Sequence, residues 1–275
     1  MAVTLDDIKS LRAKTGAGMS DCKKALTEAD GDFEKAIEII RKKGLAVAAK
    51  RSDREASEGC VLVKVEKNFG AMIALRCETD FVAKNADFIA LTESILDAAI
   101  AARCKSLDEV KALPFQGKTI ADIVIERTGI IGEKLELDGY NYFEAPEIDS
   151  YNHQGKNFLC CLVAFNKEVD DKDYIHEIAL QVAAQNPIAV RPEDVPADIV
   201  AREREIAADK ARQEGKPEAM IERIVDGRMK KFFDESCLLN QKYLVDDKKT
   251  VAEYLKAYDK DLTVTGFHRF SLRAE

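Results

Sequence analysis

The stretch GCVLVKVEKNFGAMIALRCETDFVAKNADF, residues 59–88, contains a change of hydrophobic period that decides the fold. Its first part alternates apolar and other residues around an Asn-Phe-Gly turn, which is typical of a β-hairpin. The alternating positions are Val61, Val63, Val65, Ala71, Ile73 and Leu75. Apolar residues then recur every three or four positions, as in an amphipathic helix, at Phe88, Leu91, Ile95, Ala98 and Ala102. The sequence therefore predicts a sheet covered by a helix.

The segment TDFV, residues 79–82, lies at the join between these two patterns. One interpretation is structural: Thr79 or Asp80 caps the following helix, and Phe81 packs beneath it. In the other, Asn85 caps that helix, so the segment is a separate, protruding turn. An exposed Phe81 beside a carboxylate would then be directed at a partner. The spacing alone leaves both interpretations open.

The first fifty residues predict a bundle of three short helices. The first helix ends at Gly16, the second begins after Ser20 as its N-cap, and the third ends at Gly44 behind three basic residues. Residues 46–59 contain small and charged side chains and are interpreted as a linker.

A second sheet and a helical hairpin are predicted beyond residue 143. SYNHQGKNFLCCLVAFN, residues 150–166, has the pattern of two strands joined by a turn, and a helix follows it. Residues 197–237 read as two charged helices joined at Gly215-Lys216-Pro217. Their apolar stripe is thin, so this hairpin is expected to project and meet a partner. The stripe consists of Ile199, Ile206, Met220, Ile224 and Val225. The predicted fold class is α+β, with a two-part core of antiparallel sheets. The predicted domains are residues 1–54, 55–143, 144–196 together with 238–275, and the inserted hairpin 197–237.

Composition and charge exclude several classes of protein. No apolar run reaches the length of a membrane span and no secretory signal is visible at the start, so a cytoplasmic protein without membrane contact is expected. Residues 1–54 have a net charge of +3, whereas the whole chain has −8. Because an acidic surface binds nucleic acid poorly, a protein partner is favoured.

The side chains that catalyse reactions or bind metals are poorly represented. The seven cysteines include no CxxC pair, and the three histidines lie in no promising cluster. Gly16-Ala17-Gly18 is better explained as a helix-ending turn than as a phosphate loop, and the paired aspartates lack the spacing of a calcium loop. His153 can be either a structural or a functional residue. No metal, cofactor or catalytic residue is predicted.

Six blocks of the sequence resemble the elongation factor Ts family, the guanine-nucleotide exchange factors of elongation factor Tu. The two most diagnostic are TDFVAKN and LRAKTGAGMSDCKKAL, and HEIALQVAAQNP precedes the hairpin. Two further blocks, GKPEAMIERIVDGRMKKF and LLNQKYLVDDKKTVAEYL, follow in order, and FHRF ends the series. The resemblance therefore covers essentially the whole chain.

The resemblance implies a function without bond chemistry. Members bind elongation factor Tu with GDP, displace Mg²⁺ and promote GDP release. The bundle of residues 1–54 is similar to the family's ubiquitin-associated-like domain, and the hairpin resembles its coiled-coil dimerisation module, which implies a dimer or a 2:2 complex. Partner contacts are implied for Thr79, Asp80, Phe81 and Val82, and additionally for His153, Leu11 and Met19. Two rival interpretations exist. In the first, residues 1–54 are a ubiquitin-binding module. In the second, the chain is an enzyme, which would need a nucleophile and a base that the sequence does not supply.

Three segments depart from the family pattern. The chain ends in SLRAE after FHRF, where members often have Gly-Glu, so the C-terminal contact is in question. LELDGYNYF is acidic and aromatic where basic residues are usual, and GKNFLCCLVAF replaces a glycine-rich turn and aliphatic strand. These contacts are expected to be rebuilt locally.

Overall fold

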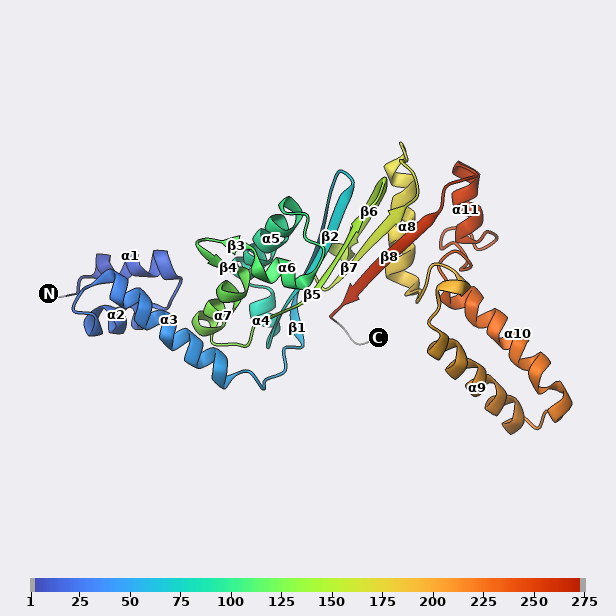
Figure 1. Cartoon of the computed structure of the whole chain (residues 1–275), viewed down its shortest axis with the longest axis horizontal. Coiled ribbons are helices and arrows are strands. Elements are labelled where there is room, and N and C mark those ends of the chain that lie inside the picture. The colour runs from blue at the N-terminus through green and yellow to red at the C-terminus, as the bar shows by residue number, and fades with distance from the viewer. Residues whose placement is uncertain (1–2, 273–275) are drawn as a thin grey trace. The chain divides into compact units, whose positions relative to one another are not determined.

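The computed structural model describes residues 3–272, and its helices and strands are labelled in Figure 1. The chain divides into two compact units. One contains residues up to 62, residues 71–141 and the residues from 271, and the other contains residues 63–70 and 142–270. Two three-stranded sheets and many helices confirm the predicted α+β class. The finer domain boundaries predicted from the sequence stay a prediction.

The bundle at the start of the chain consists of three helices around a small apolar core. They are α1 (Leu5–Thr15), α2 (Met19–Glu28) and α3 (Phe33–Lys50). Gly16 ends α1 with a φ of 71°, as predicted. Two predicted boundaries are wrong. Helix α2 begins one residue after Gly18, its N-cap, instead of after Ser20, and α3 continues through Gly44 to Lys50, into the predicted linker.

Gly44 lies inside α3 at the point where α7 (Ile120–Ile131) crosses this helix. A Cβ atom on Gly129 of α7 would lie only 2.0 Å from the Cα atom of Gly44. Gly44 is buried, and both helices lie in the same unit. The glycine that a sequence pattern reads as a helix end thus lies inside a helix at a close crossing, where Gly129 is the residue that has no room for a side chain.

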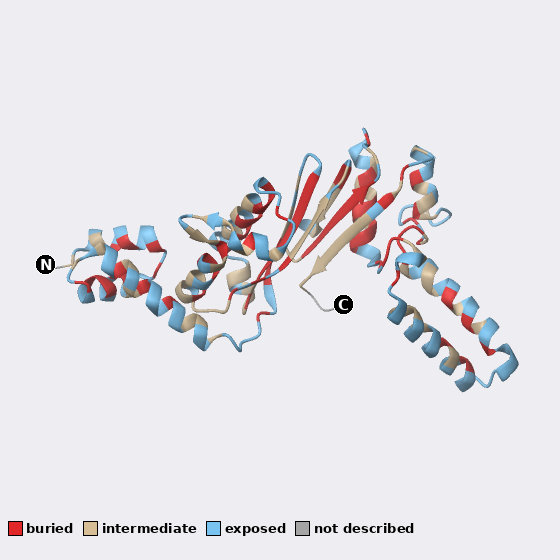
Figure 2. Ribbon diagram, in the orientation of Figure 1, coloured by how far each residue is buried: buried red, intermediate tan, exposed pale blue. Residues whose placement is uncertain are grey.

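The first sheet has the strand order β1-β2-β5, from β1 (Glu58–Glu66), β2 (Phe69–Cys77) and β5 (Glu136–Glu144). The predicted Asn-Phe-Gly turn is wrong by one residue, because the turn is Lys67-Asn68, with Lys67 at a φ of 55°. Phe69 and Gly70 belong to β2, which is buried along nearly its whole length (Figure 2). The remaining elements of the unit that contains residues 71–141 are α4 (Asp80–Ala83), α5 (Ala86–Ala101), α6 (Leu107–Ala112), β3 (Pro114–Phe115) and β4 (Lys118–Thr119).

The second sheet has the order β6-β7-β8, with β7 in the centre. Strands β6 (Glu147–Asn152) and β7 (Leu159–Phe165) pair antiparallel, from Glu147 opposite Phe165 to Asn152 opposite Cys160. Every residue of β7 is buried, so both of its faces are covered and its sequence is a continuous apolar run. The other elements are η1 (His153–Gly155), α8 (Lys172–Gln185), η2 (Pro192–Asp194), α11 (Val251–Tyr258) and β8 (Val264–Ser271).

The predicted helical hairpin consists of α9 (Ala197–Gln213) and α10 (Glu218–Ser236). Its seam differs from the predicted stripe and is formed by Ala207, Ala211, Ile221, Val225 and Met229. Ile206 and Met220, which the pattern assigns to the stripe, are about half exposed, because alanines provide the close contact between the helices. The seam is the narrow buried stripe along both helices in Figure 2.

All seven cysteines are buried, and none of them forms a disulfide. Burial raises the pKa of the Cys60 and Cys77 thiols to about 12, and that of Cys237 to about 11. Because the thiolate is the reactive form, a thiol reagent at pH 8 is expected to modify none of the seven cysteines in the folded chain and all seven in denaturant. Stoichiometric labelling before unfolding would contradict this arrangement.

Candidate partner-binding site

The TDFV segment forms a separate helical turn, α4, between β2 and α5. Thr79 is the N-cap of α4, and its Oγ1 atom accepts a hydrogen bond from the Val82 backbone N–H at 3.4 Å. Asn85 is the N-cap of α5, with Oδ1 accepting from Asp87 N–H at 2.8 Å. Phe81 is 83% exposed. Of the two interpretations left open by the sequence, the protruding turn is the one observed.

Asp80 is also on the surface of this turn. Its carboxylate forms an ion pair with Lys84 at 2.6 Å, one helical turn later. The hydrogen bond from Lys84 lowers the pKa of Asp80, so the carboxylate is charged at neutral pH. The turn therefore presents a charged group and an aromatic ring on adjacent residues.

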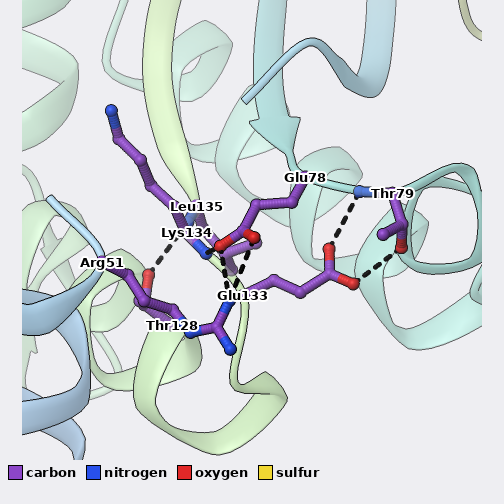
Figure 3. Close-up of polar contacts among 7 residues, drawn as sticks. All are labelled: Arg51, Glu78, Thr79, Thr128, Glu133, Lys134 and Leu135. Carbon is purple, nitrogen blue, oxygen red and sulfur yellow. Dashed lines mark hydrogen bonds and ion pairs between the residues drawn. The ribbon is translucent and has the colours of Figure 1, made fainter. Parts of the chain in front are cut away.

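Hydrogen bonds from distant parts of the sequence hold the start of this turn (Figure 3). The Glu133 carboxylate accepts from the Thr79 backbone N–H at 3.0 Å and from the Thr79 hydroxyl at 2.7 Å. The neighbouring Glu78 accepts from Lys134 N–H at 2.6 Å and from Arg51 Nη1 at 2.8 Å. The Lys134 N–H, with the Arg51 guanidinium adding to it, lowers the pKa of Glu78.

Sequence reasoning did not identify Arg51, Glu78 or Glu133. Thr79 and Glu133 are 54 residues apart, and a glutamate after a helix end matches no motif. Nothing in the sequence around Glu133 distinguishes it from a solvent-exposed glutamate.

An apolar groove of about 360 Å³ lies beside α4 in the same unit. Its lining residues are Gly16, Phe81, Val82, Asn85, Asp87, Phe88, Leu91, Arg127, Ile130 and Ile131. Gly16 lines the groove next to Arg127. A Cβ atom on Gly16 would lie 2.8 Å from Arg127 Nη1. The groove thus joins the turn after α1 to the protruding turn.

Leu11 and Met19 have different environments in the bundle. Leu11 has no exposed surface and lies in the bundle core, so the partner contact predicted for Leu11 would have to act through the bundle that it supports. Its place at the centre of an i, i+3, i+4 apolar face is the physical reason for this burial. Met19 is partly buried and begins α2, where part of its side chain is accessible.

His153 belongs to the other unit and lies in η1, directly after β6. Its Nδ1 atom lies 3.0 Å from the Tyr151 hydroxyl, and its ring meets Phe158 edge to face. Among the described residues, its Nε2 atom has no hydrogen-bond partner. His153 is thus held by its neighbours with one ring nitrogen left to donate or accept.

The departures from the family pattern fall within ordinary elements. LELDGYNYF forms most of β5, where Tyr142 stacks on Phe69 at a centroid distance of 5.7 Å. GKNFLCCLVAF supplies the buried strand β7. Of SLRAE, residues 273–275 lie outside the described residues, so the C-terminal contact is not placed.

No helix within residues 3–272 is long and apolar enough to cross a membrane. In the same part of the chain, no group of three or more His, Cys, Asp or Glu side chains is placed to hold a metal ion.

The family model and the similar known proteins all point to the same family. A family model described as Elongation factor TS matches residues 78–274. The chain is 50% identical to Elongation factor Ts of Porphyromonas gingivalis, and 49% identical to that of Bacteroides fragilis. It is 45% identical to Elongation factor Ts of Azobacteroides pseudotrichonymphae, and all three comparisons cover 100% of both chains. With its protruding TDFV turn and end-to-end similarity to these relatives, the chain belongs to the elongation factor Ts family.

Proposed function

We propose that this chain binds elongation factor Tu in its GDP-bound form and promotes GDP release, so that GTP can bind. The observation that carries the proposal is the exposed Phe81 on a turn whose start is hydrogen-bonded to the body of its unit. The chain would act in the cytoplasm as a nucleotide exchange factor, without making or breaking a covalent bond.

Exchange requires only differential binding. If the chain binds nucleotide-free elongation factor Tu more tightly than the GDP-bound form, thermodynamic linkage makes GDP and the chain weaken each other's binding by the same factor. Mg²⁺ on the phosphates is the natural point of attack, because a divalent ion is among the largest charges in such a site.

The protruding turn supplies two suitable groups. Phe81 would enter an apolar pocket between helices of the partner, and Asp80 would disturb the polar and water network that holds the ion. Asp80 is paired with Lys84 in the free chain, so this pair must open or move as a unit on binding.

The magnitude of the effect requires more than the turn. Burying one phenylalanine side chain contributes about 1.5–3 kcal/mol. Shifting an equilibrium by about ten-thousandfold requires about 5.5 kcal/mol. The bundle with Met19, and the second unit with His153, would supply the remaining binding energy.

The test is the release of a fluorescent GDP analogue from cognate elongation factor Tu at physiological magnesium, with catalytic amounts of the full chain. The expected result is strong acceleration that persists over many turnovers. Release at the uncatalysed rate would refute the proposal and leave the family membership as a statement about fold.

The hairpin of α9 and α10 is proposed as an association module, giving a dimer or a 2:2 complex. Ile206 and Met220 support this, because they leave apolar surface exposed outside the seam. Sedimentation of the chain with and without elongation factor Tu is expected to show the larger species. A monomer and a 1:1 complex at all concentrations would contradict it.

A further inference from the structure

The protruding turn cannot hold its own conformation. Helix α4 has four residues and none of them is fully buried, so packing fixes its orientation only weakly. A single helical turn is unstable in isolation, because nucleation fixes several backbone dihedrals for one hydrogen bond. Its orientation must be set by contacts outside the turn.

The Glu133 carboxylate provides these contacts. Its two oxygens accept separately from Thr79, one from the backbone N–H at 3.0 Å and the other from the hydroxyl at 2.7 Å. The same hydroxyl oxygen accepts from the Val82 N–H, so the glutamate is connected to both ends of the first turn. Figure 3 shows the carboxylate facing Thr79.

Glu133 itself is held in place. It follows Gly132, which ends α7 in the left-handed conformation at a φ of 79°. The next residue, Lys134, donates its backbone N–H to Glu78, whose carboxylate also binds Arg51. Leu135 N–H donates to the Thr128 hydroxyl at 3.1 Å. The segment that carries Glu133 is therefore fixed on both sides.

We propose that Glu133 is a positioning residue for nucleotide exchange, which acts through Thr79 to hold Phe81 in the orientation that meets the partner. The inference rests on the proposed function. A carboxylate suits this position because charge-assisted hydrogen bonds are stronger than neutral ones, and because it offers two acceptors to two donors of one residue. An incorrectly oriented Phe81 would still allow docking through other surfaces but would not release GDP efficiently.

The experiment compares the full chain with its Glu133→Ala variant in two measurements. In the free chain, amide hydrogen exchange at Thr79 and Val82 is expected to speed up in the variant, whereas exchange in α5 and α7 is unchanged. In GDP-release assays, the maximal rate is expected to fall about tenfold while the KM for the GDP-bound partner stays close to that of the unmodified chain.

Glu136→Ala is the matched control. Glu136 lies three residues further along and pairs with Lys134 at 3.1 Å, so its removal disturbs the same segment without touching Thr79. Both measurements are expected to stay at the values of the unmodified chain. Glu133→Gln, which retains one oxygen acceptor, is expected to recover part of the maximal rate.

The outcomes separate this inference from the proposed function. Unchanged exchange of the Thr79 amide in Glu133→Ala would overturn the inference, and so would faster amide exchange with an unaltered maximal rate. An equal loss in Glu136→Ala would reduce Glu133 to a structural residue of the segment and overturn it as well. If the unmodified chain does not accelerate GDP release, the proposed function fails, while the amide measurement still decides whether Glu133 holds the turn.

Discussion

Phe81→Ala is expected to lower the maximal rate of GDP release from elongation factor Tu by about tenfold to a hundredfold. The reason is that burying this side chain in the partner would contribute about 1.5–3 kcal/mol, and each 1.4 kcal/mol corresponds to a factor of ten. Because the ring is 83% exposed in the free chain, its removal should leave the free energy of unfolding nearly unchanged. Stopped-flow release of a fluorescent GDP analogue measures the rate, and titration measures the affinity.

Val245→Ala is a suitable control for this variant. Val245 is 73% exposed, so its replacement by alanine also removes exposed apolar surface. It lies outside the unit that contains α4. Its release rate is expected to match that of the unmodified chain. A Phe81→Ala variant as active as the control would remove the aromatic wedge from the mechanism, even if the chain is an exchange factor.

Gly129→Ala is expected to lower the free energy of unfolding by about 1–3 kcal/mol, as overpacking of a close contact does. The added Cβ atom would lie 2.0 Å from Gly44 Cα and 2.8 Å from Gly44 C and O. These are backbone atoms, so no side-chain rotation relieves the clash and α3 must move away from α7. Arg51, which caps α3 and binds Glu78, would move with it, so exchange activity should fall too. Urea unfolding measures the loss of stability.

Two other glycine variants serve as controls for Gly129→Ala. A Cβ atom on Gly44 would approach Gly129 Cα only to 3.5 Å, an ordinary contact, so Gly44→Ala should be tolerated. Gly227, inside α10, has no atom within 4 Å of such a Cβ, and Gly227→Ala should stabilise the chain by about 0.5–1 kcal/mol. Equal stability of the Gly129 and Gly227 variants would show that the helix crossing has room for a side chain.

Local features of the fold could be predicted because neighbouring residues decide them. Thr250 caps α11 and Glu253 bonds back to it, as the spacing of these two residues indicates. Ser106 and Thr119 likewise cap α6 and α7. Asn186 ends α8 in the left-handed conformation directly before Pro187. In each case the hydrogen bond joins residues at most four positions apart.

The candidate site was predictable only in part. The similarity of TDFV to a family motif identified Phe81 and Asp80, and the availability of Asn85 as a second cap indicated a separate turn. The same reasoning assigned a partner contact to Leu11, which the bundle core excludes from the surface. Residue type and spacing show where a side chain can point, but burial depends on the elements that pack over it.

The sequence by itself determined the α+β class, the order of most helices and strands, and the family. These follow from hydrophobic period, capping residues and motif order, all of which are read over short distances. Only the tertiary structure decided that Gly129 serves a helix crossing, that two alanines belong to the hairpin seam, and that Glu133 holds Thr79. The physical reason is that each of these contacts joins segments far apart in the chain, and its partner is chosen by the fold.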